Sequence, residues 1–133
     1  MTDFPVTIFH NPACGTSRNV VSMVETAGYR PVVVEYLKAG WTADQLSALF
    51  AEAGLTPREA MREKGAPATE LGLLDPGTPD TAILAAMVAH PLLVNRPIGR
   101  TPRGAALCRP SEKVFDLLEQ APDRFVKEDG QVV

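Results

Sequence analysis

The chain has 133 residues, of which 45% are hydrophobic and 22% are charged, and these proportions are typical of one globular domain. A net charge of −3 without any basic run argues against a protein that binds nucleic acid or a membrane surface. Two cysteines are too few for a disulfide scaffold, and no apolar run is long enough to span a bilayer. We therefore expect a cytoplasmic protein with reduced thiols.

The first third of the chain alternates between strand and helix signals. Residues 6–9 form a β-branched and aromatic run that predicts a strand, and a proline and a glycine then interrupt it. Apolar residues recur at helical spacing over 18–27, and Gly28 suits the position just after a helix. Residues 32–37 predict a second strand. The opening therefore reads as strand, cysteine-containing loop, helix and strand.

The middle of the chain carries three signals for the start of a helix. Thr42 and Gln45 match a capping box in front of an apolar stripe. Thr56 and Thr78 are each followed by proline and then, within three residues, by an acidic side chain. Proline after His90 stops the last of these helices. We therefore predict a helical insertion over about 42–90.

The last third returns to strands. Residues 97–100 and 105–107 flank a turn that contains proline and glycine, which predicts a β-hairpin. Ser111 is the predicted cap of a final helix, and the polar tail from Pro122 onward is expected to fray.

The predicted order is β-α-β, a helical insertion, and then β-β-α. A β-α-β unit places two parallel strands together with a right-handed crossover, and a hairpin adds antiparallel partners. This order predicts the α/β class, with a thioredoxin-like mixed sheet and a helical insertion between its two halves. We expect residues 1–133 to form one such domain.

Cys14 lies in the turn between the first predicted strand and the first predicted helix. The start of a helix presents unpaired backbone N–H groups and a partial positive charge, which stabilise a thiolate, the nucleophilic form of the side chain. The N–H groups of Gly15, Thr16 and Ser17 are also placed to bind an oxyanion. A lone cysteine is often only a small buried hydrophobe, but the polar segment around Cys14 does not resemble core sequence.

The residues that follow Cys14 exclude two familiar kinds of cysteine site. A local dithiol motif needs a second cysteine three positions on, where this chain has Ser17, so any redox cycle needs an outside thiol. A phosphatase-type loop needs an arginine six positions on, where this chain has Val20.

Three motifs resemble the glutathione/glutaredoxin-dependent arsenate reductases. They are His-Asn-Pro-Ala-Cys-Gly-Thr-Ser-Arg-Asn at 10–19, Asn-Arg-Pro-Ile at 95–98 and Leu-Cys-Arg-Pro-Ser-Glu at 107–112. The likeness runs from about Val6 to Leu118, and the Lys-Glu-Asp-Gly segment at 127–130 also fits the family.

This resemblance implies a site and a reaction. It implies Cys14 as the nucleophile, Arg62, Arg96 and Arg109 as the arginines that bind the anion, and a cis bond before Pro97. It also implies arsenate as substrate, glutathione as co-substrate and glutaredoxin as partner, with no bound cofactor and no metal. Arginine suits the task, because its planar guanidinium matches tetrahedral oxyanions and offsets the repulsion between arsenate and a thiolate.

Four further side chains have open interpretations. His10 either tunes the thiolate or is structural, and Ser17 either donates a hydrogen bond to the sulfur or caps the helix. Arg18 is a local cation or a surface charge. Cys108 is interpreted as a buried small side chain rather than a resolving thiol.

Two other functions of the same fold family stay open. One is a redox-sensing regulator that binds RNA polymerase, although such sensors use a local dithiol that Ser17 rules out here. The other is a general glutathione-dependent thiol reductase, which would not need three arginines. No large apolar stripe argues for a dimer, so we expect a monomer.

Overall fold

The computed structural model describes residues 4–64 and 66–133. The chain divides into two compact units. One, here called the sheet unit, combines Met1–Glu35 with Arg96–Val133, and the other, the helical unit, is Tyr36–Asn95. The insertion predicted over about 42–90 lies within the helical unit. That the two units form one domain stays a prediction.

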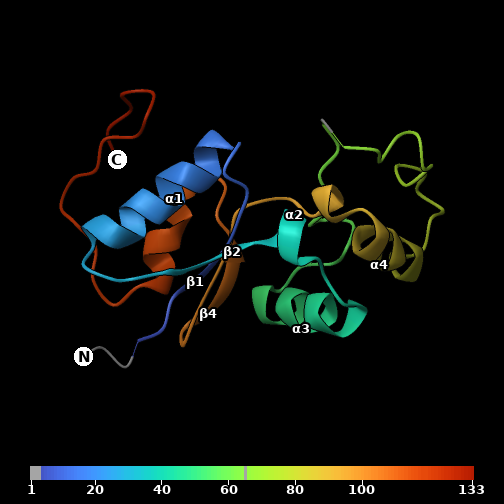
Figure 1. The fold of residues 1–133 in the computed structure, drawn as a ribbon, viewed down its shortest axis with the longest axis horizontal. Helices are drawn as coiled ribbons and strands as arrows, with labels where there is room; N and C mark the ends of the chain where they lie inside the picture. The colour runs from blue at the N-terminus through green and yellow to red at the C-terminus, as the bar shows by residue number, and fades with distance from the viewer. Residues whose placement is uncertain (1–3, 65) are drawn as a thin grey trace. The chain divides into compact units, whose positions relative to one another are not determined.

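The sheet unit is built on a four-stranded mixed sheet with the order β2-β1-β3-β4. The strands are β1 (Thr7–His10), β2 (Val32–Glu35), β3 (Ile98–Thr101) and β4 (Gly104–Leu107). Strand β1 pairs in parallel with β2 and antiparallel with β3, and β3 and β4 form an antiparallel hairpin (Figure 1). The predicted mixed sheet, with a hairpin that adds antiparallel partners, is confirmed.

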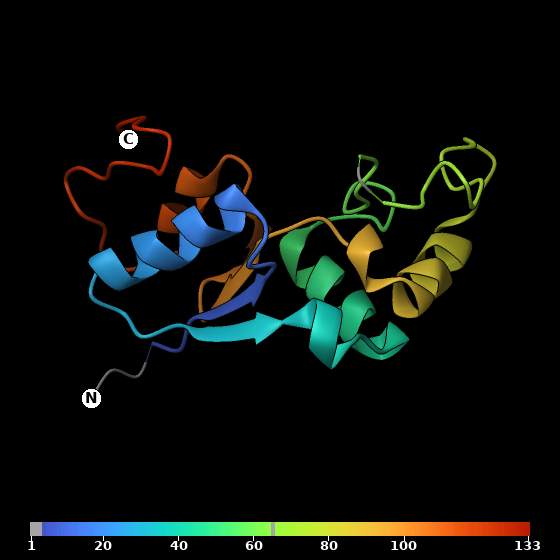
Figure 2. The ribbon, with the colours of Figure 1, turned by 45° about the horizontal axis from the view of Figure 1, so that its top comes forward.

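Helices α1 (Gly15–Thr26) and η2 (Ser111–Leu117) pack against each other beside the sheet (Figure 2). Their apolar side chains enclose Ile8 of β1 in the core of the unit. The buried members contributed by the two helices are Val20, Met23, Val24, Val114 and Leu117. Burial of such side chains contributes roughly 1.5–3 kcal/mol each. Because α1 and β1 share this core, the loop that joins them is held at both ends.

The C-terminal tail is ordered against this core, so the expectation that it frays is wrong. Phe125 is buried in the core cluster, and it exchanges two backbone hydrogen bonds with Val133, of 3.0 and 2.9 Å. The Lys127 N–H donates to the carbonyl of Gln131 at 2.8 Å, which closes the turn between them. Phe125, with Val133 packed against the same core cluster, and this local pairing hold the tail in place.

The helical unit contains α2 (Tyr36–Ala39), α3 (Ala43–Ala53), α4 (Asp80–Ala89) and the short 3₁₀ helix η1 (Pro91–Leu93). The predicted capping box of α3 is present: the Gln45 N–H donates to the Thr42 hydroxyl at 3.1 Å, and the Gln45 side chain accepts from the Thr42 N–H.

Three predicted elements differ from the structure. The second strand ends at Glu35, because the Tyr36 side chain is buried in the helical unit, where its hydroxyl donates to the Val94 carbonyl at 2.8 Å. The helix predicted from Thr56 is a single turn, since the chain then bends to pair Met61 with Val94. The final helix is 3₁₀, and its cap position is Pro110 rather than Ser111.

Tyr29 joins the end of α1 to the segment after η2 and offers a test of this packing. Its buried hydroxyl accepts the backbone N–H groups of Glu119 and Gln120 at 3.0 and 3.1 Å. Tyr29→Phe leaves both donors without this acceptor, so we expect the free energy of unfolding to fall by about 1–3 kcal/mol. Urea denaturation measures this, and an unchanged midpoint would show that the two bonds do not contribute.

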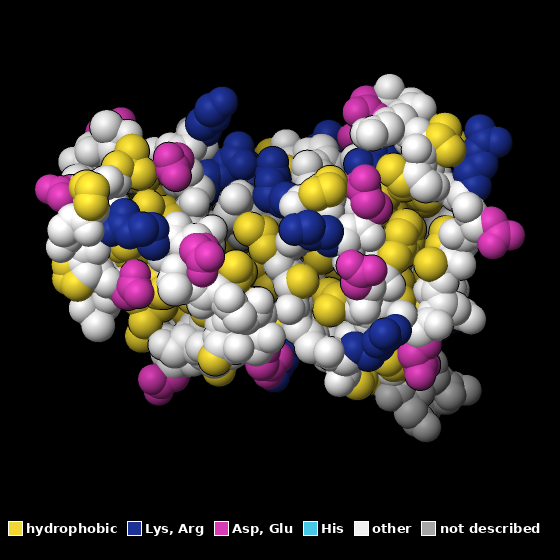
Figure 3. Space-filling view, turned by 180° about the vertical axis from the view of Figure 1, so that it is seen from behind, with side chains coloured by type: hydrophobic (Ala, Val, Ile, Leu, Met, Phe, Trp, Pro, Cys, Tyr) yellow, Lys and Arg dark blue, Asp and Glu magenta, His cyan; other side chains and the backbone are white. Residues whose placement is uncertain are grey.

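No helix within the described residues is long and apolar enough to cross a membrane. On the face drawn in Figure 3, acidic and basic side chains are interspersed, with apolar groups between them.

Candidate active site

Cys14 occupies the cap position of α1, at the end of the loop that follows β1. Its N–H donates to the Asn11 carbonyl at 3.0 Å, and its own carbonyl accepts the Arg18 N–H at 3.0 Å. The Asn11 side chain accepts the Ala13 N–H at 2.9 Å, which tightens the same turn. Strand β1 ends at His10, just before Pro12, and α1 begins at Gly15, so only a short loop separates the two elements. The sulfur is thereby fixed at the positive end of α1.

The environment of Cys14 favours its thiolate. The thiol is half-buried, and burial raises its pKa. Hydrogen bonds from the Ser17 N–H, the Arg96 and Arg109 side chains and the Thr16 N–H outweigh this effect and lower the Cys14 pKa to about 6. At neutral pH the sulfur is therefore mostly ionised.

Arg96 precedes β3 and Arg109 follows β4, and both side chains hydrogen-bond to the Cys14 sulfur. Arg109 Nη1 lies 3.8 Å from Cys14 Sγ and also donates to the Arg96 carbonyl at 2.9 Å. The Arg96 side chain is buried. Both peptide bonds that follow these arginines, Arg96–Pro97 and Arg109–Pro110, are cis. The hairpin thus places two guanidinium groups beside one thiolate.

Ser17 and Gly15 follow Cys14 in the first turn of α1. The Ser17 side chain is fully buried, and its hydroxyl accepts the Asn11 N–H at 3.4 Å rather than capping α1. A Cβ at Gly15 would meet only ordinary contacts, at 3.6 and 3.7 Å. Packing within the chain therefore leaves room for a Cβ at Gly15.

His10 ends β1 and is buried. Burial lowers its pKa, against an opposing effect of the Glu35 charge, so the ring is neutral at neutral pH. Its Nδ1 has no hydrogen-bond partner among the described residues. A neutral ring gives no support to stabilisation of the thiolate by charge, and the role of His10 stays a prediction.

Arg62 belongs to the helical unit. Its N–H donates to the Leu93 carbonyl at 2.7 Å, and its Nε donates to the Lys64 carbonyl at 2.9 Å. Its Nη1 approaches Asn95 Oδ1 at 3.5 Å. These contacts hold the backbone of Arg62 beside the segment that leads to Arg96, while its action on a substrate stays a prediction.

Comparison with known proteins identifies the family. The model of the ArsC family matches residues 9–117. The chain belongs to the ArsC family. It is 56% identical to arsenate reductase ArsI1 of Synechocystis, over 100% of this chain and 93% of that protein. It is 44% identical to the arsenate reductase of Escherichia coli K12, over 96% of this chain and 92% of that protein.

Solved structures agree with this assignment. The arsenate reductase from Vibrio cholerae superposes with a TM-score of 0.83 at 36% identity, covering 88% of this chain and 100% of that one. The mixed sheet and its helices therefore have the thioredoxin-like arrangement of ArsC-family proteins.

Cys108, the second thiol of this ArsC-family chain, is a core side chain. It is fully buried in the cluster that contains Ile8, its sulfur approaches the Ala106 carbonyl at 3.6 Å, and burial raises its pKa to about 12. This agrees with the interpretation of Cys108 as a buried small side chain. Within the described residues, no cluster of His, Cys, Asp and Glu could hold a metal ion.

Sequence reasoning missed a contact between the tail and the first turns of α1. Arg18 forms an ion pair with Glu128, and Asn19 accepts the Glu128 N–H at 3.0 Å. The only local signal was the Lys-Glu-Asp-Gly segment, which does not indicate a partner more than a hundred residues away.

Proposed function

We propose that this chain reduces arsenate to arsenite through a covalent intermediate on Cys14. Membership of the ArsC family and the names of its full-length relatives support arsenate as the substrate. The observation that carries the proposal is the juxtaposition of one thiolate, two guanidinium groups and the backbone N–H groups at the start of α1. The cations offset the repulsion between two anions that must meet.

The first step is attack of the Cys14 thiolate on As(V). A sulfur–arsenic bond forms, and one arsenate oxygen leaves as hydroxide or water. Arg96, Arg109 and the N–H groups of Thr16 and Ser17 stabilise the charge on the remaining oxygens, with Arg62 as a third guanidinium. The role of Gly15 in this step is to let the backbone and the substrate approach closely.

The following steps draw electrons from two outside thiols, because the loop has Ser17 in place of a second cysteine. The glutathione thiol displaces a second oxygen, which leaves as water, and bonds to arsenic. A glutaredoxin thiolate then attacks the glutathione sulfur. That sulfur leaves arsenic with a new disulfide bond to glutaredoxin, and arsenic keeps the electron pair and becomes As(III). Water releases arsenite and restores the Cys14 thiol.

This function places the protein in the cytoplasm, where glutathione and glutaredoxin are reduced, and it needs only a monomer. Buried Cys108 is not required, since glutaredoxin supplies the resolving thiol.

The test is arsenate-dependent NADPH consumption in the presence of glutathione, glutathione reductase and glutaredoxin. We expect turnover from the intact chain and none above background from Cys14→Ser. Equal rates from both proteins would end the proposal. Omitting glutaredoxin from the same assay shows whether turnover needs this second thiol.

A further inference from the structure

The Arg18 guanidinium holds a carboxylate of the chain itself. Arg18 Nε lies 3.0 Å from Glu128 Oε2, and Arg18 Nη2 lies 3.0 Å from Glu128 Oε1. Two parallel N–H···O bonds of this kind are the geometry in which arginine recognises a carboxylate. Arg18 lies in the first turns of α1, and Glu128 lies in the C-terminal tail, so the pair joins distant parts of the sheet unit.

The pair lies against the loop that carries the nucleophile. Arg18 Nη1 donates to the Pro12 carbonyl at 2.8 Å, and the Arg18 N–H donates to the Cys14 carbonyl at 3.0 Å. A Cβ added to Gly15 would lie 3.6 Å from Arg18 Nη2 and 3.7 Å from Glu128 Oε1. The bound carboxylate is therefore next to the residue that follows Cys14.

The carboxylate of Glu128 is exchangeable. The side chains of Arg18 and Glu128 are 45% and 48% exposed, and ion pairs this exposed are weak and screened by salt. The tail does not depend on this pair, because it is also held by Phe125 in the core and by the Lys127–Glu112 ion pair at 2.7 Å. A carboxylate from solution can replace that of Glu128 without unfolding the tail.

We propose that the Arg18 guanidinium is the binding site for a carboxylate of the thiol co-substrate, and that Glu128 occupies this site in the resting protein. The inference rests on the proposed function only for the identity of the thiol. That thiol is glutathione, a peptide with two carboxylates. A carboxylate held beside Gly15 keeps the thiol of the same molecule close to Cys14, which raises its effective concentration at the sulfur. Release of the product lets Glu128 return.

The test uses a thiol-exchange reaction that contains no arsenate. Cys14 is first converted to a mixed disulfide with uncharged dipyridyl disulfide, and glutathione is then added. The glutathione thiolate attacks the Cys14 sulfur, a Cys14–glutathione disulfide forms, and 2-thiopyridone leaves with the electron pair of the broken bond. Absorbance of thiopyridone gives the rate, and Cys14→Ser gives the blank. The diethyl ester of glutathione, which lacks both carboxylates, is the matched thiol.

We expect Arg18→Gln to slow exchange with glutathione by about three- to tenfold and to leave exchange with the diester within about twofold. Glu128→Gln removes the internal competitor, so exchange with glutathione is expected to rise by about two- to fivefold.

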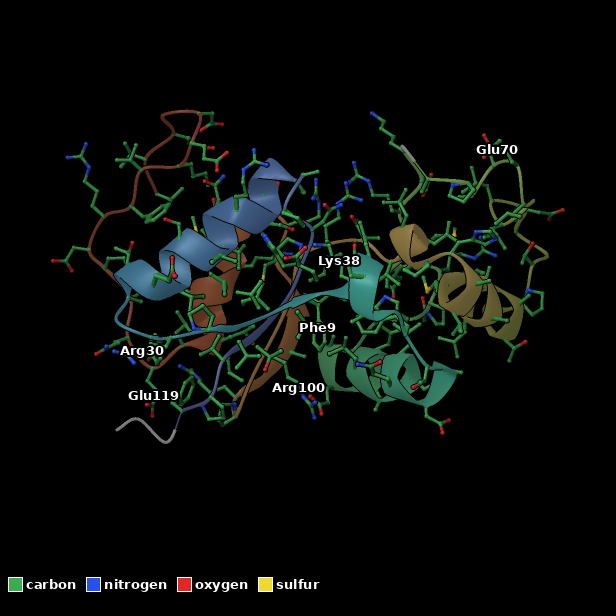
Figure 4. The ribbon with its side chains drawn as sticks, viewed as in Figure 1. Phe9, Arg30, Lys38, Glu70, Arg100 and Glu119 are labelled. Carbon is green, nitrogen blue, oxygen red and sulfur yellow. The ribbon has the colours of Figure 1, made fainter. Side chains whose placement is uncertain are left out.

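Two variants serve as controls. Arg30→Gln removes the same charge beyond the other end of α1 (Figure 4), and Glu112→Gln breaks the second ion pair of the tail. Neither is expected to change exchange with glutathione by more than about twofold.

Three outcomes would overturn the proposal. Equal slowing of both thiols by Arg18→Gln would make Arg18 a residue that positions the loop. If Arg30→Gln slows exchange with glutathione as much as Arg18→Gln does, the effect of Arg18 is only a general attraction of anions. A loss in Glu128→Gln that matches the loss in Arg18→Gln would make the pair structural. Arsenate turnover plays no part in these rates, so a failure here and a failure of the proposed function are separate results.

Discussion

Replacing Arg109 with alanine is expected to lower kcat/KM for arsenate by about 10²–10³-fold, the effect of removing one preorganised donor from an oxyanion site. Arg109 Nη1 lies 3.8 Å from Cys14 Sγ and also donates to the Arg96 carbonyl at 2.9 Å. Its loss thus removes a cation beside the thiolate and a support of the second arginine. Arg109→Lys keeps the charge without the planar fork, so its kcat/KM is expected to lie between those of the intact chain and of Arg109→Ala.

The same variants separate arsenate reduction from general thiol reduction. Glutathione-dependent reduction of a small uncharged disulfide uses Cys14 but needs no oxyanion site. Assayed at about pH 8.5, where the thiolate forms in every variant, Arg109→Ala is expected to retain that activity within about fivefold. If both activities fall by the same factor, the general thiol reductase is the better description. Arg30→Ala is the matched loss of charge and is expected to leave both unchanged.

The sheet unit was largely predictable from local signals. The apolar run before Cys14, the helical spacing that ends at Gly28 and the turn between β3 and β4 each fix one element through its own residues. Gly28 has a φ of 100°, as its predicted position after α1 requires. The parallel and antiparallel pairing then follows from connection length.

The elements that differ are those in which distant contacts outweigh local preference. Thr56 and Glu59 make the reciprocal bonds of a capping box, at 2.9 and 3.1 Å, and yet only one turn forms. Met61 instead pairs with Val94 in an isolated antiparallel bridge. The strand signal of Tyr36 is likewise overridden by the burial of its ring and the hydrogen bond of its hydroxyl.

The candidate site divides in the same way. The place of Cys14 at the start of a helix followed from neighbouring residues, whereas Arg96 and Arg109 were assigned to the site through the resemblance to the arsenate reductases. Two features depend on contacts between segments far apart in the chain. These are the donation of Arg109 to the Arg96 carbonyl and the carboxylate of Glu128 on Arg18, neither of which any spacing in the sequence encodes.

Alkylation of Cys14 by iodoacetamide is expected to follow a titration with its midpoint near the pKa of about 6. Only the thiolate reacts, so the rate rises with pH through this midpoint and is level above about pH 7.5. Cys108 is fully buried, with a pKa raised to about 12, and is expected to stay unlabelled. Cys14→Ser should therefore show no labelling over the same range.

The midpoint, rather than the rate at one pH, decides whether Cys14 is activated. At pH 7 a thiol with a pKa of about 6 is roughly 90% ionised, against about 3% for an ordinary thiol. Thiolate nucleophilicity falls as the pKa falls, which cancels about tenfold of that gain, so the two rates differ only about threefold. Arg109→Ala removes a donor and a cation from the thiolate, so its midpoint must move to higher pH. A wild-type midpoint near that of an ordinary thiol, or one that Arg109→Ala leaves in place, would contradict the view that the hairpin arginines hold the sulfur ionised.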